Sequence, residues 1–405
     1  MAWVICAAIA ISYLDRQTLP WAIKSIQADI PITNQFKAML DSAFLVAYGL
    51  MYLGGGWLLD RIGTRRGLAV IMTAWSLACA SQGLARGLPG LAVSRLFLGA
   101  GEGGSFPAAT RAVAEGFPVQ DRALAMGLIN GGTAVGAVAA PPLIALVLLH
   151  VHEFGLPGWR WMFFLSGAIG LVWTAWWLAR RQPPVIEAAP SPPPPTISVL
   201  DLLGRREVQG IVAAKFLSDG AWYFFLFWLP KYLFETQRFD LREAASIGWI
   251  PYAASGIGCL VGGWCSGACL RGGRSVNFAR KAALGLSAAC MPWVMLAPAA
   301  PSVPVVLALF SLAFFGQQSW STLVMTLPGD LAPPAALGRL AGLIGMGGAF
   351  GGVVMGQGAG WVLDHGFGYG PVLAVAGSLH VAAFALICVT VPVIRPLCFQ
   401  PKGST

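Results

Sequence analysis

Long apolar runs follow one another along the 405 residues and leave almost no stretch polar enough to be a soluble domain. A helix needs about 20 largely apolar residues to cross the hydrocarbon core of a bilayer. Only 11% of the residues are charged, which is too few for a water-soluble surface. We therefore predict an all-α polytopic membrane protein. Twelve transmembrane helices are expected near residues 1–23, 38–59, 67–86, 88–112, 122–149, 158–179, 207–233, 243–270, 276–297, 303–327, 337–363 and 369–394.

A proline-rich stretch separates the sixth expected span from the seventh. Residues 181–206 contain few large apolar side chains, so we expect an extended cytoplasmic linker there. The linker divides the chain into an N-terminal six-helix bundle, residues 1–180, and a C-terminal six-helix bundle, residues 207–395. Residues 396–405 form the expected cytoplasmic tail. Two equal bundles joined by a loose loop are the plan of many transporters built from repeats.

The excess of basic residues predicts the orientation of the chain. The net charge of +9 arises from 26 Lys and Arg against 17 Asp and Glu. Most of the basic residues fall in short loops on one side of the predicted membrane, which is the positive-inside pattern rather than a nucleic-acid-binding surface. We expect a multi-pass protein of the inner (plasma) membrane, with both termini cytoplasmic. Lipid is the expected surroundings, nucleic acid is not an expected partner, and a monomer is expected.

The sequence contains no recognisable motif for a metal site or for a catalytic nucleophile. The eight cysteines include no CxxC pair, and the chain has only four histidines. Neither HExxH nor GxSxG occurs. We therefore expect no metal site, no cofactor apart from a coupling proton, and no enzymatic activity. An enzyme embedded in the membrane is the alternative from another functional class. A receptor derived from a transporter is a further alternative, and a measurement of substrate flux would distinguish it from a carrier.

Four ionisable residues lie within the first and fourth expected spans, where each costs several kcal/mol unless it is paired or hydrated. Asp15 and Arg16 are adjacent, so their side chains diverge by about 100° and each needs a partner on another helix. Arg95 and Glu102 share a helix face but lie roughly 10 Å apart along it. We expect Asp15 and Glu102 to face Arg16 and Arg95 across one polar cavity. Static salt bridges that lock the bundle are the alternative.

Two further polar clusters lie at membrane depth. Lys215 and Asp219 are one turn apart in span seven and could neutralise each other or contact a substrate. Buried amides and hydroxyls require hydrogen-bond partners, which a hydroxylated substrate or neighbouring helices would provide. Aromatic residues beside these groups could contact a sugar ring, although lipid anchoring explains them equally well. The candidate substrate-binding residues of these clusters are Lys215, Asp219, Trp222, Tyr223, Gln317, Gln318, Trp320 and Ser321.

Two basic and two acidic groups in a low-dielectric cavity suit a proton-coupled carrier of organic anions. A guanidinium group binds a carboxylate in bidentate geometry. A partly desolvated carboxyl group can load and release a proton during a transport cycle. The spacing of these residues establishes neither step.

The segment between spans two and three resembles the loop signature of the major facilitator superfamily. It reads Gly56-Trp-Leu-Leu-Asp60-Arg61-Ile-Gly63-Thr-Arg65-Arg66. A glycine here permits close helix approach, the aspartate can cap or bridge to a neighbouring helix, and the arginines hold the cytoplasmic face. The resemblance implies a gating or conformational role for Gly56, Asp60, Arg61, Gly63, Arg65, Arg66, Arg111 and Arg122.

Further stretches resemble the anion:cation symporter family, which includes bacterial hexuronate and sugar-acid permeases, sialin and the vesicular glutamate carriers. They are Tyr13-Leu-Asp15-Arg16-Gln-Thr-Leu, Arg95-Leu-Phe-Leu-Gly-Ala-Gly-Glu102-Gly-Gly-Ser-Phe-Pro107 and Gly158-Trp-Arg-Trp-Met-Phe163. The resemblance implies that Asp15 and Glu102 are the protonatable pair and that Arg16 binds the substrate carboxylate. It further implies that Arg95 is the partner of Glu102, and that Tyr13 and Tyr48 line the cavity.

The expected function is import of a small organic anion, a hexuronate or related sugar acid, by proton symport through alternating access. Within the family, the segments around Arg16, Lys215 and Trp320 are most similar to hexuronate transporters. Another carboxylate, such as an aldonate, an aromatic acid or an amino-acid-derived acid, is the alternative substrate. A drug/proton antiporter is less favoured, because the segment from Gly132 to Pro142 in span five lacks the Gly-Pro step of antiporters.

Overall fold

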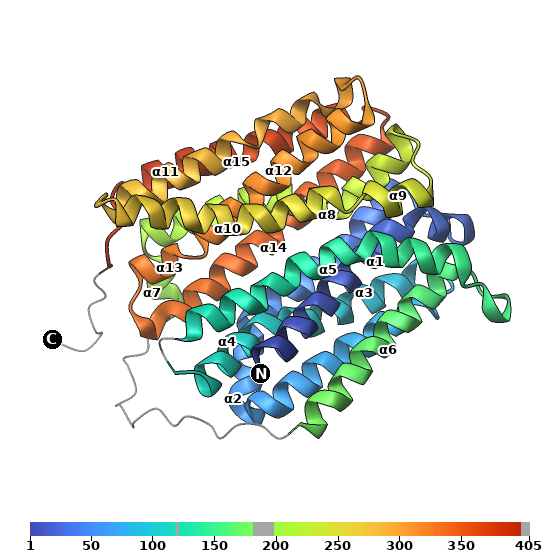
Figure 1. Ribbon diagram of the computed structural model, residues 1–405, viewed down its shortest axis with the longest axis horizontal. Helices are drawn as coiled ribbons and strands as arrows, with labels where there is room; N and C mark the ends of the chain where they lie inside the picture. Colours follow the sequence, from blue (N-terminus) through green and yellow to red (C-terminus); the bar gives the residue numbers. More distant parts are fainter. Residues whose placement is uncertain (119–120, 181–197, 398–405) are drawn as a thin grey trace.

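The computed structural model describes residues 1–118, 121–180 and 198–397. Residues 181–197 of the predicted linker and residues 398–405 of the predicted tail lie outside this part of the chain. All regular elements within the described ranges are helices (Figure 1). They are α1 (Ala2–Asp29), α2 (Asn34–Gln82), α3 (Leu88–Gly103), α4 (Ser105–Gly116), α5 (Arg122–His150), η2 (Glu153–Gly155), α6 (Gly158–Ala179), α7 (Val199–Leu203), α8 (Arg206–Thr236), α9 (Leu241–Ile247), α10 (Ile250–Arg271), α11 (Val276–Ala289), η3 (Pro292–Ala299), α12 (Val303–Val324), α13 (Leu327–Leu331), α14 (Pro334–Asp364) and α15 (Tyr369–Thr390).

Over the described ranges these elements make the twelve membrane crossings that the sequence predicts. The second and third crossings both belong to α2, which reverses direction at Gly63, where φ is 76°. That left-handed backbone conformation favours glycine, because a side chain would be strained there. The fourth crossing consists of α3 and α4, which meet at Gly104, and the ninth consists of α11 and η3.

Eight of the crossings within the described residues are long and apolar enough to span a membrane by length and composition alone. They extend from α5 to α15, and their mean hydropathy ranges from 1.2 to 2.4. Charged residues in α1 and α3, including Arg16 and Glu102, lower the hydropathy of two of the remaining crossings. The least apolar part of the membrane domain therefore carries the candidate site.

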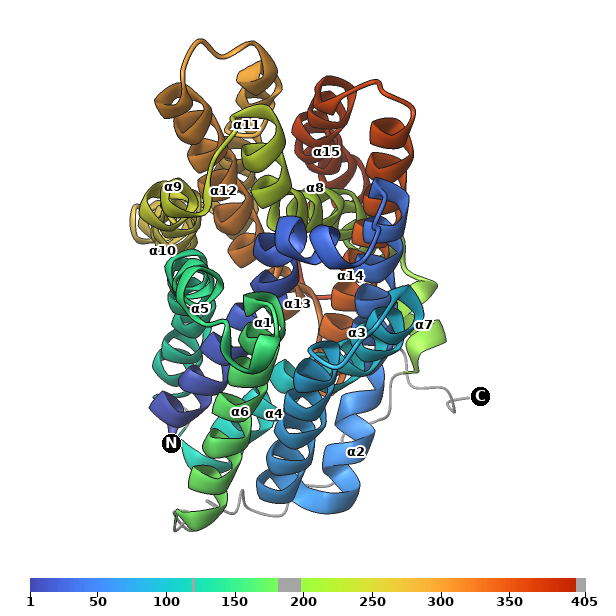
Figure 2. The ribbon, with the colours of Figure 1, turned by 90° about the vertical axis from the view of Figure 1, so that its right-hand side faces the viewer.

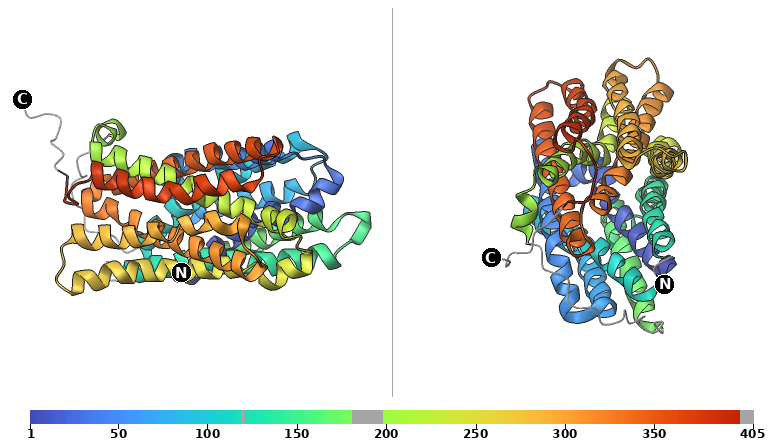
Figure 3. Two further views of the ribbon diagram at one scale, coloured as in Figure 1. Left: turned by 90° about the horizontal axis from the view of Figure 1, so that it is seen from above. Right: turned by 90° about the vertical axis from the view of Figure 1, so that its left-hand side faces the viewer.

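The helices form two six-helix bundles. Figure 2 shows α1 to α6 together, in blue to green, with α8 to α12 and α15 above them, in yellow-green to red, and with α13 and α14 between the two groups. The bundles meet mainly where α2 packs against α14, α5 against α9 and α10, and α1 against α8. We call the end of the molecule at which α1 begins the Met1 end, and the opposite end, at which α14 finishes, the Asp364 end. The helices run approximately parallel to this long axis (Figures 1 and 3).

The α2–α14 contact is built on small residues. A Cβ atom at Gly49 would lie 3.0 Å from the Cβ of Ala349, and one at Gly345 would lie 2.8 Å from the ring of Tyr52. Gly360 lies equally close to Ala38. Small residues let membrane helices approach at the distance of their backbones, where van der Waals contact is the main attraction.

Candidate functional site

Arg16 and Glu102 form a buried ion pair between α1 and α3. The Nε of Arg16 lies 2.5 Å from Oε2 of Glu102, and the hydroxyl of Ser12 donates to the same oxygen at 2.8 Å. Arg16 is 1% exposed and Glu102 is fully buried. The Nη2 of Arg16 and Oε1 of Glu102 are also buried, yet neither makes a hydrogen bond to any group that the structure describes. Each partner therefore uses only part of its bonding capacity.

Aromatic rings surround the guanidinium of Arg16. Its central carbon lies 4.4 Å from the ring centre of Tyr48, 4.8 Å from that of Tyr13 and 5.5 Å from that of Phe44. Cation–π attraction is strongest where the cation is desolvated, as it is here. The structure thus brings together three of the predicted site residues, Tyr13, Arg16 and Tyr48.

Asp15 faces a different helix from the one expected. Its Oδ1 accepts a hydrogen bond from the hydroxyl of Ser166 on α6, which in turn lies 3.6 Å from the thiol of Cys79. None of the ion pairs of the described residues includes Asp15, so it does not face Arg16 and Arg95 as predicted. The reason is helical geometry: the side chains of adjacent residues diverge, and α6 packs on the side of α1 to which Asp15 points.

Arg95 pairs with Asp41 of α2, and the prediction that Glu102 is its ion-pair partner is wrong for this structure. The Nη2 of Arg95 lies 3.3 Å from Oδ1 of Asp41, whose other oxygen lies 2.7 Å from the Nζ of Lys37. All three side chains are buried. Two helical turns separate Arg95 from Glu102, roughly 10 Å along the axis, whereas Asp41 lies directly across the α2–α3 contact.

In the C-terminal bundle the two predicted polar clusters form one network. The Nζ of Lys215 lies 2.9 Å from Oδ1 of Asp219 and donates to the hydroxyl of Ser321 at 3.0 Å. The amide of Gln317 donates to Oδ1 of Asp219 at 3.4 Å. On its other side, Gln317 accepts a hydrogen bond at Oε1 from the imidazole of His380. Lys215 and Asp219 do neutralise each other, and α12 supplies further partners.

The other predicted residues of these clusters pack less directly against the charged groups. Trp222 is 6% exposed and lies edge-on to Phe314 at 5.5 Å between ring centres. Tyr223 is buried, with its ring beside the backbone of Gly352 on α14. Gln318 accepts the hydroxyl hydrogen bond of Thr322 at its backbone carbonyl. Trp320 is fully buried.

The structure describes the side chains of only some of the predicted gating residues near the α2 reversal. Nothing beyond the backbone is described at Gly56 and Asp60. Arg65 donates to the carbonyl of Leu178 at 2.6 Å, and Arg122 donates to that of Ala114 at 2.8 Å. Arg111 pairs with Glu115 at 2.7 Å, whereas Arg61 and Arg66 are exposed. Arg65 and Arg122 thus tie helix ends together within the N-terminal bundle at the Met1 end.

Hydrogen bonds join the two bundles at the Asp364 end. The carboxylate of Asp364 accepts from the backbone N–H groups of Asn34 and Gln35, at 3.0 and 2.8 Å, and from the side chain of Asn34 at 2.9 Å. Gln357 of α14 bonds to Gln35, and it donates to the hydroxyl of Ser42 at 2.7 Å. These contacts hold α2 against α14 at the Asp364 end.

Five polar residues of the site were not predicted: Ser12, Lys37, Asp41, Ser166 and His380. Ser12 lies one turn before Arg16, so the shared helix face was a usable signal. Asp41 lies within the second expected span and is a charge at membrane depth, which was also a signal. Ser166 and His380 are single polar residues within apolar runs. Only the packing of α6 and α15 against other helices shows which groups they contact.

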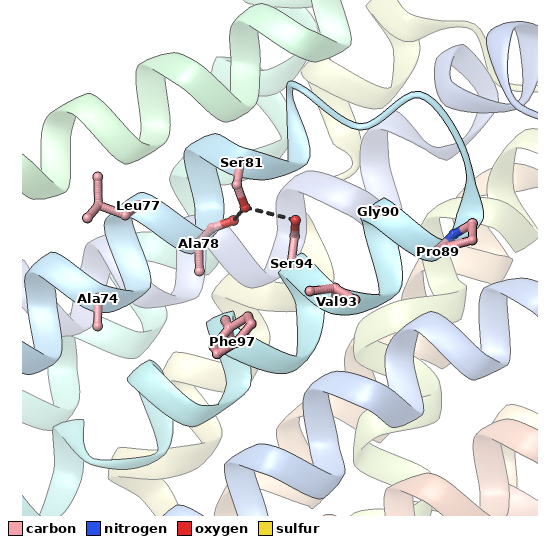
Figure 4. Close-up of a pocket in the computed structure, with 9 residues that line it drawn as sticks. All are labelled: Ala74, Leu77, Ala78, Ser81, Pro89, Gly90, Val93, Ser94 and Phe97. Atoms are coloured by element: carbon pink, nitrogen blue, oxygen red, sulfur yellow. Dashed lines mark hydrogen bonds between the residues drawn. The ribbon is translucent and has the colours of Figure 1, made fainter.

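A cavity of about 650 Å³ lies apart from these charges, between α2 and α3 (Figure 4). Leu77, Val93 and Phe97 line it, and Figure 4 shows its two hydroxyl-bearing residues, Ser81 and Ser94, bonded to each other at 2.8 Å. All three apolar side chains are more than half exposed on the outside of the bundle. The residues that line this cavity include no charged group.

Comparison with known proteins places the chain in a family. The model of the Major Facilitator Superfamily matches residues 5–356. A D-galactonate transporter of Escherichia coli is 29% identical over 95% of this chain and 92% of its own length. A hexuronate transporter of Escherichia coli is 28% identical over 85% of this chain and 84% of its own length.

Among solved structures, a bacterial homologue of the human lysosomal transporter Spinster, in an inward-facing and unoccupied conformation, has a TM-score of 0.75. It is 17% identical and covers 96% of this chain and 94% of that chain, and this likeness concerns the fold alone. These two sequence relatives are named as transporters of sugar acids, and the helices of this chain are those of a multi-pass membrane protein. The chain belongs to the major facilitator superfamily.

Proposed function

We propose that the protein imports a small organic anion, a hexuronate or related sugar acid, by proton symport. The observation that supports this most directly is the incompletely bonded ion pair between Arg16 and Glu102. A guanidinium can bind a carboxylate through two parallel N–H groups, but here Nη2 is left without a partner among the described groups. A substrate carboxylate would bind to Arg16 in place of Glu102.

Proton coupling follows from this competition. While Glu102 is ionised, it neutralises Arg16 and competes with the substrate. Protonation of Glu102 removes its charge, so the guanidinium becomes available to an incoming carboxylate. Loss of the proton on the cytoplasmic side restores the internal pair and favours release of the substrate. In this cycle Asp15, adjacent to Arg16 and bonded to Ser166, is the second proton-carrying group.

The C-terminal bundle supplies groups that suit a hydroxylated substrate. Lys215 is a second cation, and Gln317 and Ser321 carry polar groups beside it. Trp222 and Tyr223 offer ring faces on the same helix as Lys215. A carboxylate bound at Arg16 and hydroxyls bound at these groups are what a sugar acid would need. The names of the sequence relatives, which include transporters of D-galactonate and hexuronates, support the same class.

Alternating access would come from rocking of residues 1–180 against residues 207–395, with the segment between them as a cytoplasmic linker. The Asp364 end is the outer side in this proposal, and the Met1 end and residues 396–405 are cytoplasmic. The positive-inside distribution of Lys and Arg supports that orientation in the inner membrane. The proton is the only coupling ion, no other cofactor takes part, and the monomer is the transporting unit.

The test is uptake of labelled D-glucuronate and D-galactonate into proteoliposomes, with and without an inward proton gradient. We expect accumulation that depends on the gradient and that unlabelled galacturonate blocks. If only an aromatic or amino-acid-derived acid blocks the accumulation, the proposed substrate class is wrong and the proposed proton coupling stands. Uptake of sugar acid that ignores the proton gradient but follows a sodium gradient would contradict proton symport.

A further inference from the structure

His380 is a fully buried imidazole on α15, outside the set of residues discussed as contacting the substrate. Its Nε2 bonds to Oε1 of Gln317, which is also fully buried. Its Nδ1 is buried and makes no hydrogen bond within the described ranges. The ring lies edge-on to Trp320, with 5.5 Å between ring centres and an interplanar angle of 74°. Among the described residues, the imidazole thus makes one hydrogen bond, to Gln317, and one aromatic contact, with Trp320.

The direction of each hydrogen bond in this chain of groups follows from Asp219. An ionised carboxylate only accepts, so the amide of Gln317 must turn its Nε2 toward Asp219. The carbonyl oxygen of Gln317 then faces His380 and can only accept. The imidazole must therefore donate, which places its proton on Nε2. A reversed amide would set its oxygen against the carboxylate oxygen and leave two acceptors without a proton between them.

The other side of Asp219 is blocked by α14. A Cβ atom at Gly348 would lie 2.2 Å from Oδ2 of Asp219, so the carboxylate rests directly on the backbone there. Gln317 and the Gly348 backbone thus limit its movement on two sides, and Lys215 is bonded to the oxygen that faces Gln317. The orientation of the Gln317 amide therefore decides whether Asp219 faces a donor or an acceptor on this side.

We propose that His380 is a positioning residue of the transport site. Its Nε2–H fixes the amide of Gln317, which holds the Asp219 carboxylate and thereby the ammonium of Lys215 where the substrate binds. His380 itself contacts no substrate. The inference rests on the proposed function, because it assigns Lys215 and Gln317 to substrate binding.

The test uses two substitutions of His380 and a double variant. His380→Gln retains a donor at the same number of bonds from Cβ, whereas His380→Leu leaves Oε1 of Gln317 buried without a partner. We expect His380→Leu to raise the KM for D-galactonate and D-glucuronate by about tenfold, the loss expected for one buried hydrogen bond. His380→Gln should stay close to the wild-type KM.

The double variant His380→Leu with Gln317→Leu separates positioning from stability. Replacing both partners by apolar groups removes the unsatisfied atom, so folding should recover. The KM should nevertheless stay as high as in the single variant. A double variant that regains the wild-type KM, or a His380→Gln variant as defective as His380→Leu, would overturn the inference.

A second measurement does not depend on transport. Nitrogen NMR of ring-labelled histidine in membranes should show a neutral buried imidazole protonated at Nε2, whose Nε2 signal shifts in Gln317→Leu. The other three histidines, His150, His152 and His365, are exposed and provide reference signals. A proton on Nδ1 would overturn the inference. If the wild type takes up no sugar acid, the proposed function fails, and the NMR result then decides only whether His380 donates to Gln317.

Discussion

Asp364 and Asn34 lie 330 positions apart in the sequence, yet one carboxylate oxygen of Asp364 accepts both the backbone and the side-chain N–H of Asn34. The other oxygen accepts the backbone N–H of Gln35 at 2.8 Å. The first N–H groups of a helix have no partner within it, and an anion there is favoured by the helix dipole. The last residue of α14 therefore caps α2 from the opposite bundle.

Asp364→Ala should weaken closure of the Asp364 end. Loss of these charge-assisted hydrogen bonds costs roughly 1–3 kcal/mol, so the ratio of open to closed molecules at this end should rise by about fivefold to 150-fold. Electron paramagnetic resonance distances between labels at Ala28 and Phe367, in a background without the native cysteines, would report the opening. Asp240→Ala is the matched control, since Asp240 caps α9 within one bundle. An unchanged distance distribution in Asp364→Ala would contradict this role.

Asp15→Asn should abolish proton-driven accumulation, because an amide cannot carry the proton. Exchange of labelled for unlabelled substrate across the membrane should survive, since it needs no net proton movement. Both are measured in the same proteoliposomes, with and without an inward proton gradient. Glu115→Gln, which changes a partly exposed carboxylate paired with Arg111, should behave as the wild type. Accumulation by Asp15→Asn at the wild-type level would remove Asp15 from the coupling mechanism.

Arg16→Lys should raise the KM for a sugar acid by about tenfold to a hundredfold. Lysine keeps the charge but loses the planar fork that binds a carboxylate with two N–H groups, and it loses the stacking on Tyr48. Initial uptake rates at varied substrate concentration give the KM. Arg95→Lys is the comparison, because Arg95 pairs with Asp41 rather than with a substrate group. A larger increase in KM for Arg95→Lys than for Arg16→Lys would show that the substrate carboxylate does not bind to Arg16.

Gly348→Ala should reduce the affinity for substrate and leave the fold intact elsewhere. The added methyl group would lie 2.2 Å from Oδ2 of Asp219 and force the carboxylate away from Lys215. The control is Gly356→Ala, two turns further along α14, where a Cβ atom meets nothing within 4 Å. Equilibrium binding of labelled D-galactonate in detergent would measure the effect. Equal affinities in the two variants would show that Asp219 needs no fixed position.

The twelve crossings could be predicted from the sequence because bilayer thickness sets the length of an apolar run, whatever the tertiary structure. The proximity of Arg16 to Glu102 was also predictable, since each needed a partner on another helix. The pairing of Arg95 with Asp41 was not. Seven-residue spacing shows that two side chains share a face, but it does not show which neighbouring helix lies closer.

The network around His380 illustrates a second limit. A lone histidine in an apolar run has several possible partners, and its contact with Gln317 depends on how α15 rotates against α12. That rotation results from the summed packing of many apolar side chains, none of which is distinctive by itself. A buried charge must be paired, so it strongly limits the ways in which the helices can pack. A neutral imidazole or hydroxyl limits the packing much less.

The glycine-lined contact between α2 and α14 has a mechanical consequence. Where the side chains of two helices interdigitate, the helices can slide only if one row of side chains passes over the facing row. At Gly49, Gly345 and Gly360 the helices carry no side chain of their own that would have to pass the partner helix, so we expect little steric resistance to rotation of the bundles there. We expect the energy barrier to that motion to depend more on the hydrogen bonds of Asp364 and Gln357 than on the α2–α14 contact. Transport rate and leakage at the outer side should therefore respond to different substitutions. Larger side chains in the α2–α14 contact should change the transport rate, and loss of the hydrogen bonds of Asp364 or Gln357 should change the leakage.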